Sequence, residues 1–256
     1  MHNPEQLKQS ENYLERTRQV AERESVLMPE DFDSTVEELS VRLTKEEWQN
    51  EGVMVFDLPC AEGEVPAVCS ISYDSSIDRN FERNVLGEEL SEPISMVPGF
   101  QKIKGLTVER GQDRLDLKDI LDKCSVYVCP QDISYLSPQE KAELSASEHS
   151  GFILSELDPS STLGLFVLMH EIGHFVDRHS ISHEKSTARL MTGFKVAGKE
   201  ELDANDKAIM IDQERSASAF FVKNMRKFLD KETMGKINKI GIQRGIKSYH
   251  DGMEEK

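Results

Sequence analysis

The most informative segment of the chain is Leu163-Gly164-Leu165-Phe166-Val167-Leu168-Met169-His170-Glu171-Ile172-Gly173-His174-Phe175-Val176. It holds the pattern His-Glu-x-x-His inside an apolar run. Histidines four residues apart share one face of a helix, so His170 and His174 can close on one metal ion. Zinc bound by three protein ligands keeps a fourth position for a water molecule and lowers the pKa of that water to about 7. Glu171 is placed to take the proton from this water.

The same short pattern also occurs by chance on ordinary helices, so its surroundings matter. The flanking residues are strongly apolar, which predicts burial, and two buried histidines with a glutamate need a partner. Gly173 costs about 1 kcal/mol in a helix interior relative to Ala, and it predicts that another element approaches the backbone closely. Both features favour a metal site over a chance motif in a buried helix.

Composition limits the class of protein. The 256 residues can bury a sizeable core and fit one domain with an extension or two small domains. Lys and Arg number 31 against 47 Asp and Glu, and the net charge of −16 disfavours nucleic acid or an anionic membrane as the main partner. A run of roughly 18 apolar residues, as a membrane span needs, is missing. The first residues do not resemble a secretory signal, so we expect a cytoplasmic protein.

The four cysteines, Cys60, Cys69, Cys124 and Cys129, form neither Cys-x-x-Cys pairs nor a dense framework. We expect reduced and mostly buried thiols, with a second metal site or a disulfide as the alternatives.

The N-terminal residues 1–50 are predicted to be a helical extension. Residues 3–23 are charged and predict an exposed or partly disordered helix, and a second helix is expected over 34–50. It would pack on the neighbouring domain or, as the alternative, bind a partner. A helix-turn-helix is not recognisable there, which argues against direct DNA binding.

The following residues 51–256 are predicted to be one domain. Its β-type runs are 53–56, 65–73, 100–108, 125–128 and 150–157, with an acidic loop over 74–92. Helices are expected over 115–123 and 137–147, and again from 231. The run at 151–157 leads directly into the metal helix. In zinc peptidases an edge strand in that place holds an extended substrate by backbone pairing, and we predict the same role here.

A third metal ligand is needed downstream. Asp177 and Ser180 stand where a Gly and a third His would follow His174 in another zinc-site pattern, so a carboxylate from a second helix is expected. A helical pattern runs from 204 to 229. Its apolar stripe is Ile211, Ala217, Phe221, Met225 and Phe228.

Glu214 falls inside this stripe, where a charge requires a partner such as zinc. Asp212 lies about 200° away around the helix and is expected to face outward. Small residues at 216–219 would let the helix approach the metal helix closely. The alternative is that Glu214 pairs with Arg215 or a lysine at the rim.

His170-Glu171-Ile172-Gly173-His174, followed by Glu214-Arg215-Ser216-Ala217-Ser218-Ala219-Phe220-Phe221, resembles the ImmA/IrrE-type metallopeptidases. That family has HExxH and later a helix of the pattern E-x-x-A-N-x-F-A. The resemblance covers about residues 120–230. Ser218 departs from the family's Asn, and the 40 positions between His174 and Glu214 predict an inserted loop over 178–203. Residues 170–177 also resemble the lethal-factor-type toxin peptidases.

The resemblance implies a zincin-like α+β fold, with a domain core at about 120–230. It implies a cytoplasmic, site-specific zinc endopeptidase whose substrate is a regulatory protein such as a transcriptional repressor. We expect Zn²⁺ on His170, His174 and Glu214, with Glu171 as the general base. A second donor for the oxyanion is sought among His149, Tyr135, His179 and His183. The alternatives are an inactive metal-binding scaffold and a protein-interaction regulator with a chance motif.

Overall fold

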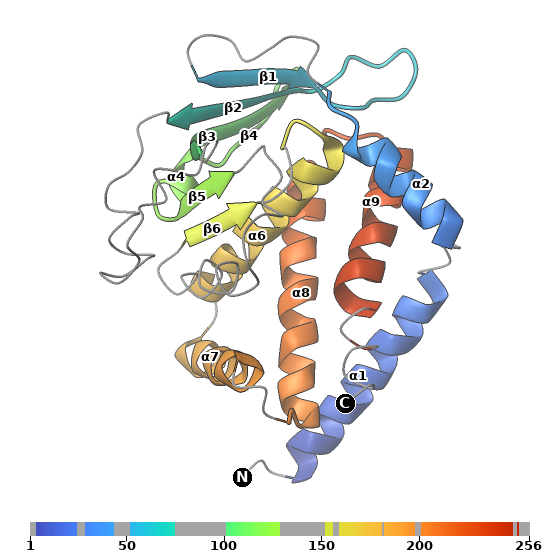
Figure 1. The fold of residues 1–256 in the computed structure, drawn as a ribbon, viewed down its shortest axis with the longest axis vertical. Coiled ribbons are helices and arrows are strands. Elements are labelled where there is room, and N and C mark those ends of the chain that lie inside the picture. Colours follow the sequence, from blue (N-terminus) through green and yellow to red (C-terminus); the bar gives the residue numbers. More distant parts are fainter. Residues whose placement is uncertain are drawn as a thin grey trace, which may run out of the picture. The chain divides into compact units, whose positions relative to one another are not determined.

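The computed structural model describes residues 4–24, 29–43, 52–74, 101–128, 152–155, 159–180, 182–197, 201–247 and 250. These residues form helices and one small sheet, which confirms the α+β class (Figure 1). The chain divides into two compact units. The helical unit is Met1–Glu38, Ile172–Lys223 and Glu232–Lys256, and the sheet unit is Leu39–Glu171 and Asn224–Lys231. The predicted boundary near residue 50 divides the sequence into two continuous segments, whereas each of these units combines separate segments. That boundary therefore stays a prediction.

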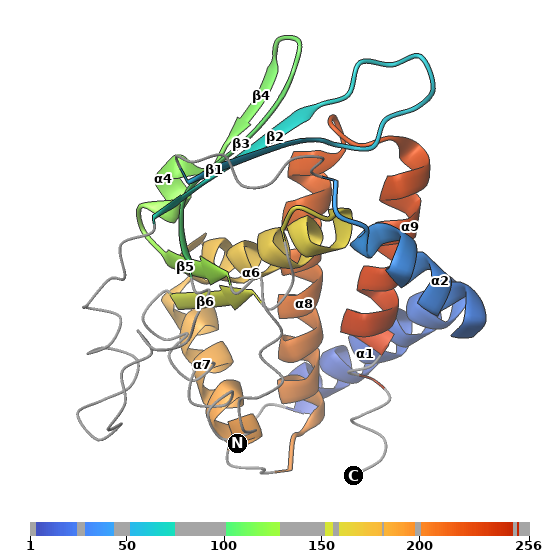
Figure 2. The same cartoon turned by 45° about the horizontal axis from the view of Figure 1, so that its top comes forward.

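The sheet unit is built on one six-stranded sheet (Figure 2). Its strands are β1 Val53–Asp57, β2 Val68–Asp74, β3 Gln101–Arg110, β4 Asp113–Asp116, β5 Ser125–Val128 and β6 Phe152–Ser155. The order is β1-β2-β3-β5-β6, and β4 pairs with β3. The pairs are antiparallel except β5 with β6, which is parallel. Strand β6 therefore ends the order of the described strands.

Alternation of apolar residues explains the strands. In β1, Met54 and Phe56 are buried and Val55 between them is exposed, as expected of a strand with one covered face. Strand β2 begins at Val68 and not at 65, because Pro66 cannot donate a ladder hydrogen bond.

The predicted helix over 115–123 was wrong in its first residues. Strand β4 occupies 113–116, and the short helix α4 Lys118–Leu121 follows. Gly111, with φ 60°, makes the tight turn that folds β4 back on β3. The hairpin pairing therefore overrides the weak helical pattern.

The helical unit contains α1 Pro4–Glu24, most of α2 Pro29–Ser40, α7 His183–Ala197, α8 Ala204–Met225 except its last two residues, α9 Lys231–Gly241 except its first residue, and a π-helix Ile242–Lys247. Helix α6 Thr162–Ser180 belongs to the sheet unit up to Glu171 and to the helical unit from Ile172. Helix α9 agrees with the predicted C-terminal helix and buries Ile237 and Ile240.

Helix α1 was predicted to be exposed or partly disordered because of its charged sequence, but part of it is buried. Thr17 and Ala21 are buried, and Thr17 Oγ1 lies 3.1 Å from Nε2 of the buried His250. Helix α2 begins earlier than predicted, with Pro29 at its first position, and ends at Ser40. Residues 44–50 of that prediction lie outside the described residues.

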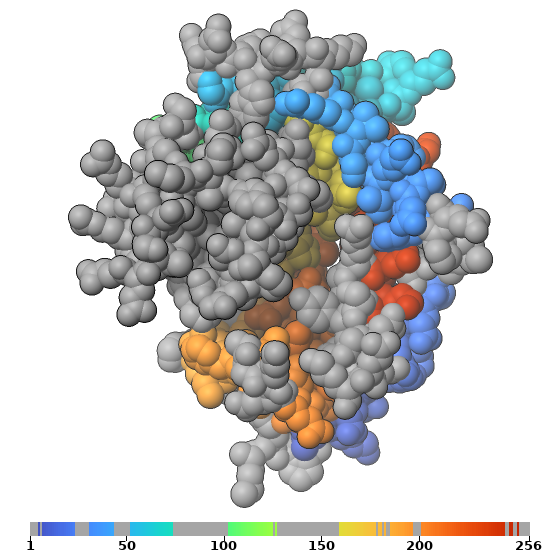
Figure 3. Space-filling view, in the orientation of Figure 1, coloured from blue at the N-terminus to red at the C-terminus, as the bar shows by residue number. Residues whose placement is uncertain are grey.

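Residues 178–203 were predicted to be an inserted loop, and this was wrong because they contain α7. Large apolar side chains of α7 are exposed, which weakens the usual amphipathic signal. They are Leu190, Met191, Phe194 and Val196. In the space-filling view α7 lies at the surface, in light orange (Figure 3).

Cys69 and Cys124 are buried free thiols, as predicted, and Cys60 is a half-buried free thiol. Burial raises the pKa of Cys124 to about 11 and raises that of Cys69 further. Cys129 and the predicted helix 137–147 lie outside the described residues, as does all but the first residue of the loop 74–92. Among the described helices, none is long and apolar enough to cross a membrane.

Candidate metal centre

Helix α6 is fixed at its start by a serine cap. Ser161 Oγ accepts a hydrogen bond from the backbone N–H of Gly164 at 2.9 Å, and the Ser161 carbonyl accepts from Leu165 at 2.9 Å. The apolar run that follows is buried, with the side chains of Leu165, Leu168, Met169 and Ile172 fully covered. Packing of this face leaves the opposite face to His170, Glu171 and His174, which are half-buried.

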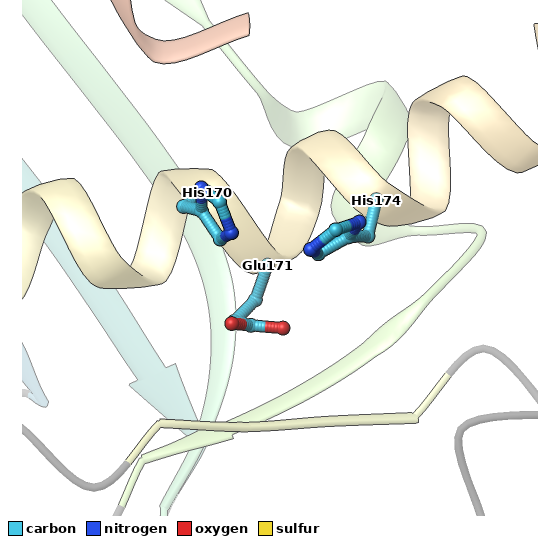
Figure 4. Close-up of side chains that lie close together, drawn as sticks. All are labelled: His170, Glu171 and His174. Atoms are coloured by element: carbon cyan, nitrogen blue, oxygen red, sulfur yellow. The ribbon is translucent and has the colours of Figure 1, made fainter. Parts of the chain in front are cut away.

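His170, Glu171 and His174 form a cluster that could hold a metal ion. One ligand atom from each residue lies within 4.8 Å of the others. In Figure 4 both imidazoles extend from the same side of α6. The Glu171 carboxylate lies between them and extends farther from the helix. One turn of helix separates the two histidines, so the backbone alone sets this arrangement.

Glu214 of α8 reaches one of these histidines. Its Oε1 lies 3.5 Å from His174 Nε2, and the side chains are 15% and 25% exposed. Two ligands of a tetrahedral zinc, each about 2.0–2.1 Å from the metal, lie about 3.4 Å apart. The separation of 3.5 Å therefore fits two ligands of one ion. Arg215, the alternative partner from the sequence, donates to Tyr13 Oη at 3.0 Å and lies over its ring.

Helices α6 and α8 meet at a glycine. A Cβ atom added to Gly173 would lie 2.7 Å from the Ala217 carbonyl oxygen and 3.0 Å from Phe220 Cβ. Only a glycine fits here, which confirms the close approach predicted from Gly173 and from the small residue Ala217. The residues of the predicted stripe are all buried, but α8 ends at Met225 and not at 229 as predicted, so Phe228 lies in the turn that follows the helix. The contact lies next to His174 in α6 and three residues after Glu214 in α8.

Asp177 and Asp212 flank the two ligand candidates and share one partner. Arg189 of α7 donates from Nη1 to Asp177 Oδ2 and from Nη2 to Asp212 Oδ2, the latter at 3.1 Å. Asp212 is 52% exposed, which agrees with the predicted outward orientation. Sequence reasoning missed Arg189, because nothing in its spacing connects it to carboxylates 12 and 23 residues away.

Of the four candidates for a second oxyanion donor, the structure describes the side chain of His179 only. His179 Nδ1 donates to the Phe175 carbonyl at 2.8 Å, and its ring lies 4.1 Å from that of Phe175. Five residues after His174, it points about 140° away around the helix. The His183 side chain, Tyr135 and His149 lie outside the described part of the chain.

Strand β6 lies beside the first half of α6 in the sheet unit. Figure 4 shows a strand with grey trace at both ends, which is β6, on the side toward which Glu171 points. As the last described strand in the sheet order, β6 has one edge that β5 does not occupy.

No family model, curated protein or solved structure matches the chain. The geometry of α6, α8 and β6 therefore carries the functional argument.

Proposed function

We propose that the chain is a zinc-dependent endopeptidase that hydrolyses a protein substrate. The observation that carries the proposal is the 3.5 Å approach of Glu214 to His174, next to the His170, Glu171 and His174 cluster. Two imidazoles and one carboxylate are a donor set that zinc takes in hydrolytic enzymes. Zinc held by His170, His174 and Glu214 would polarise the peptide carbonyl and lower the pKa of the attacking water.

Glu171 is the proposed general base and then the general acid. Its carboxylate takes a proton from the water as the water oxygen bonds to the carbonyl carbon. The same carboxyl then gives the proton to the amide nitrogen, the carbon–nitrogen bond breaks, and a carboxylate and an amine leave. Glu171 is half-buried and follows His170 directly, so the helix holds the base beside the proposed ligands.

The edge of β6 that none of the described strands occupies supports an extended peptide as the substrate. Pairing of the substrate backbone with this edge would carry the scissile bond past Glu171. The net charge of −16 suits a basic segment better than an acidic one. We propose a cytoplasmic regulatory protein such as a transcriptional repressor as the substrate, since the family resemblance implies one.

Zinc stoichiometry tests the three ligands. Purified wild-type protein, reconstituted at neutral pH, is expected to hold one zinc per chain by elemental mass spectrometry. Glu214→Gln is expected to fall well below one zinc per chain, because the amide cannot offer an anionic oxygen and only the weaker binding by the two histidines remains. Asp206→Asn is the control, since it removes a buried carboxylate from the same helix and should keep the metal. A wild-type protein without zinc would contradict the proposal and favour a regulator with a chance motif.

Glu171→Gln separates an enzyme from an inactive scaffold. The variant should keep the metal and lose cleavage of a peptide library by a factor of about 10²–10⁴, because only the proton transfer is removed. Mass spectrometry of the products would show the cleaved bonds. If the zinc-loaded wild type and this variant are equally inactive toward peptides and unfolded proteins, the scaffold alternative is correct.

A further inference from the structure

Arg189 makes a two-armed contact between the helices that carry His174 and Glu214. Its side chain is only 9% exposed, and its two Nη atoms donate to different carboxylates. Asp177 belongs to α6, three residues after His174, and Asp212 belongs to α8, two residues before Glu214. One guanidinium on α7 therefore connects the two helices at the ligand positions.

The contact between Gly173 and Ala217 is the other fixed point of the same two helices. In α6, His174 lies between Gly173 and Asp177. In α8, Glu214 lies between Asp212 and Ala217. A single close contact fixes the distance between two helices but leaves them able to pivot, whereas two contacts fix the angle as well. Along each helix, the proposed ligand therefore lies between the Gly173–Ala217 contact on one side and the carboxylate that contacts Arg189 on the other.

We propose that Arg189 is a positioning residue that holds Glu214 at the correct distance from His174 for joint metal binding. This inference rests on the proposed zinc site. Arg189 acts through Asp177 and Asp212 and itself touches neither ligand in this role. Outer partners that orient metal ligands typically change metal affinity by 10–100-fold when they are removed.

The planar guanidinium is essential to this role. It presents separate N–H groups to two carboxylates at a fixed angle, and a lysine ammonium on a flexible stem does not. Arg189→Met should weaken zinc binding by about 10–100-fold, measured by competition with a chromophoric chelator. Arg189→Lys should recover only part of this loss, because one ammonium keeps the charge without the fork.

A matched control separates positioning from general stability. Lys195 also connects α7 to α8, through Nζ to Asp206 Oδ2 at 2.6 Å, but this contact is far along α8 from Glu214. Lys195→Met should lower the thermal unfolding temperature of the metal-free protein as Arg189→Met does. Its zinc affinity should remain within about twofold of wild type, because Asp206 lies eight residues before Glu214 in α8 and the carboxylates that contact Arg189 are unchanged.

A double-mutant cycle gives the decisive readout. If Arg189 acts by placing Glu214, then Arg189→Met combined with Glu214→Gln should bind zinc no more weakly than Glu214→Gln alone. Additive losses would overturn the proposal and show a merely structural role. Unchanged zinc affinity in Arg189→Met would overturn it too, while leaving the zinc site in place. A wild-type protein that binds no zinc would instead remove the proposed function and this inference together.

If Arg189→Met does not fold, Asp212→Asn takes its place, because Asp212 is largely exposed and its loss should be tolerated. It replaces a charged acceptor of Arg189 Nη2 with a neutral amide and so weakens one arm of the bridge, and a threefold to tenfold weakening of zinc binding is expected, coupled to Glu214 in the same cycle. Unchanged affinity in Asp212→Asn would overturn the proposal.

Discussion

Helices α6 and α7 follow each other in the chain and are held in place by different forces. In α6 the apolar face is buried, and the backbone of Gly173 touches α8 directly. In α7 four large apolar side chains are 44–54% exposed, and Arg189, Thr192 and Lys195 attach the helix by hydrogen bonds to carboxylates. Apolar packing holds α6 in place, and polar contacts hold α7 in place. This difference predicts that mutations in the two helices act on different properties.

The largest expected effect comes from filling the contact between α6 and α8. Gly173→Ala places a Cβ 2.7 Å from the Ala217 carbonyl oxygen, against backbone that cannot turn away. Overpacking of this kind should lower the free energy of unfolding by about 3 kcal/mol, measured by urea denaturation. Ser218→Ala, one residue along α8, is the control for a small change near the same contact. A loss of less than about 1 kcal/mol in Gly173→Ala would show that α8 shifts easily and that the contact does not position the ligands.

The second-largest expected effect is the loss of zinc affinity when a proposed ligand in α6 is replaced. His174→Gln should weaken zinc binding at least about a hundredfold, or about 2.7 kcal/mol, because a ligand is lost and not only an outer partner. His179→Gln is the matched control in the same helix, since His179 is exposed and donates to the Phe175 carbonyl. Chelator competition measures both. Equal zinc affinities in the two variants would mean that His174 is not a ligand.

The sequence was sufficient where apolar packing decides the structure. The stripe from Ile211 to Met225 predicted which face of α8 is buried, and Glu214 inside that stripe lies 3.5 Å from His174, while its role as a metal ligand stays a prediction. Gly173 likewise predicted a close contact. In each case a residue type is required by its immediate neighbours in the helix, so the requirement is visible in the local pattern.

The sequence was insufficient where polar contacts decide the structure. Helix α7 was predicted to be a loop, because its exposed apolar residues lack a buried stripe and its contacts are made by charges. Arg189 finds Asp177 and Asp212 only after three helices have packed, and many other carboxylates in an acidic chain offer the same charge. Strand β4 was missed for a related reason, since its pairing depends on the turn at Gly111 and on the neighbouring strand.

The third prediction tests the polar attachment of α7. Asp206 is buried and accepts from Thr192 Oγ1 at 3.1 Å and from Lys195 Nζ at 2.6 Å. Burial raises its pKa, but the hydrogen bonds from Lys195 and Thr192 outweigh that effect and hold the pKa below its usual value. Asp206→Asn keeps the shape and removes the charge. It should lower the free energy of unfolding by about 2 kcal/mol at pH 7.

This loss should depend on pH in a defined direction. Because folding lowers the pKa of Asp206, its contribution is fully present above the unfolded value of about 3.9 and disappears as the pH falls through the lower folded value. The difference between wild type and Asp206→Asn should therefore shrink below about pH 4. Hydrogen exchange should show faster opening of α7 in the variant at pH 7. A difference that stays constant down to pH 2 would mean that the charge of Asp206 does not hold α7.

The smallest expected effect is a gain of stability in α7. Gly193 lies in the helix interior, and an added Cβ would meet no atom within 4 Å. Gly193→Ala should therefore raise the free energy of unfolding by about 0.5–1 kcal/mol, because alanine restricts the unfolded chain and favours the helix. The same substitution thus has opposite signs in two consecutive helices, since Gly173 is required by a contact and Gly193 is not. Urea denaturation of both variants measures this, and a destabilised Gly193→Ala protein would show that α7 is packed as tightly as α6.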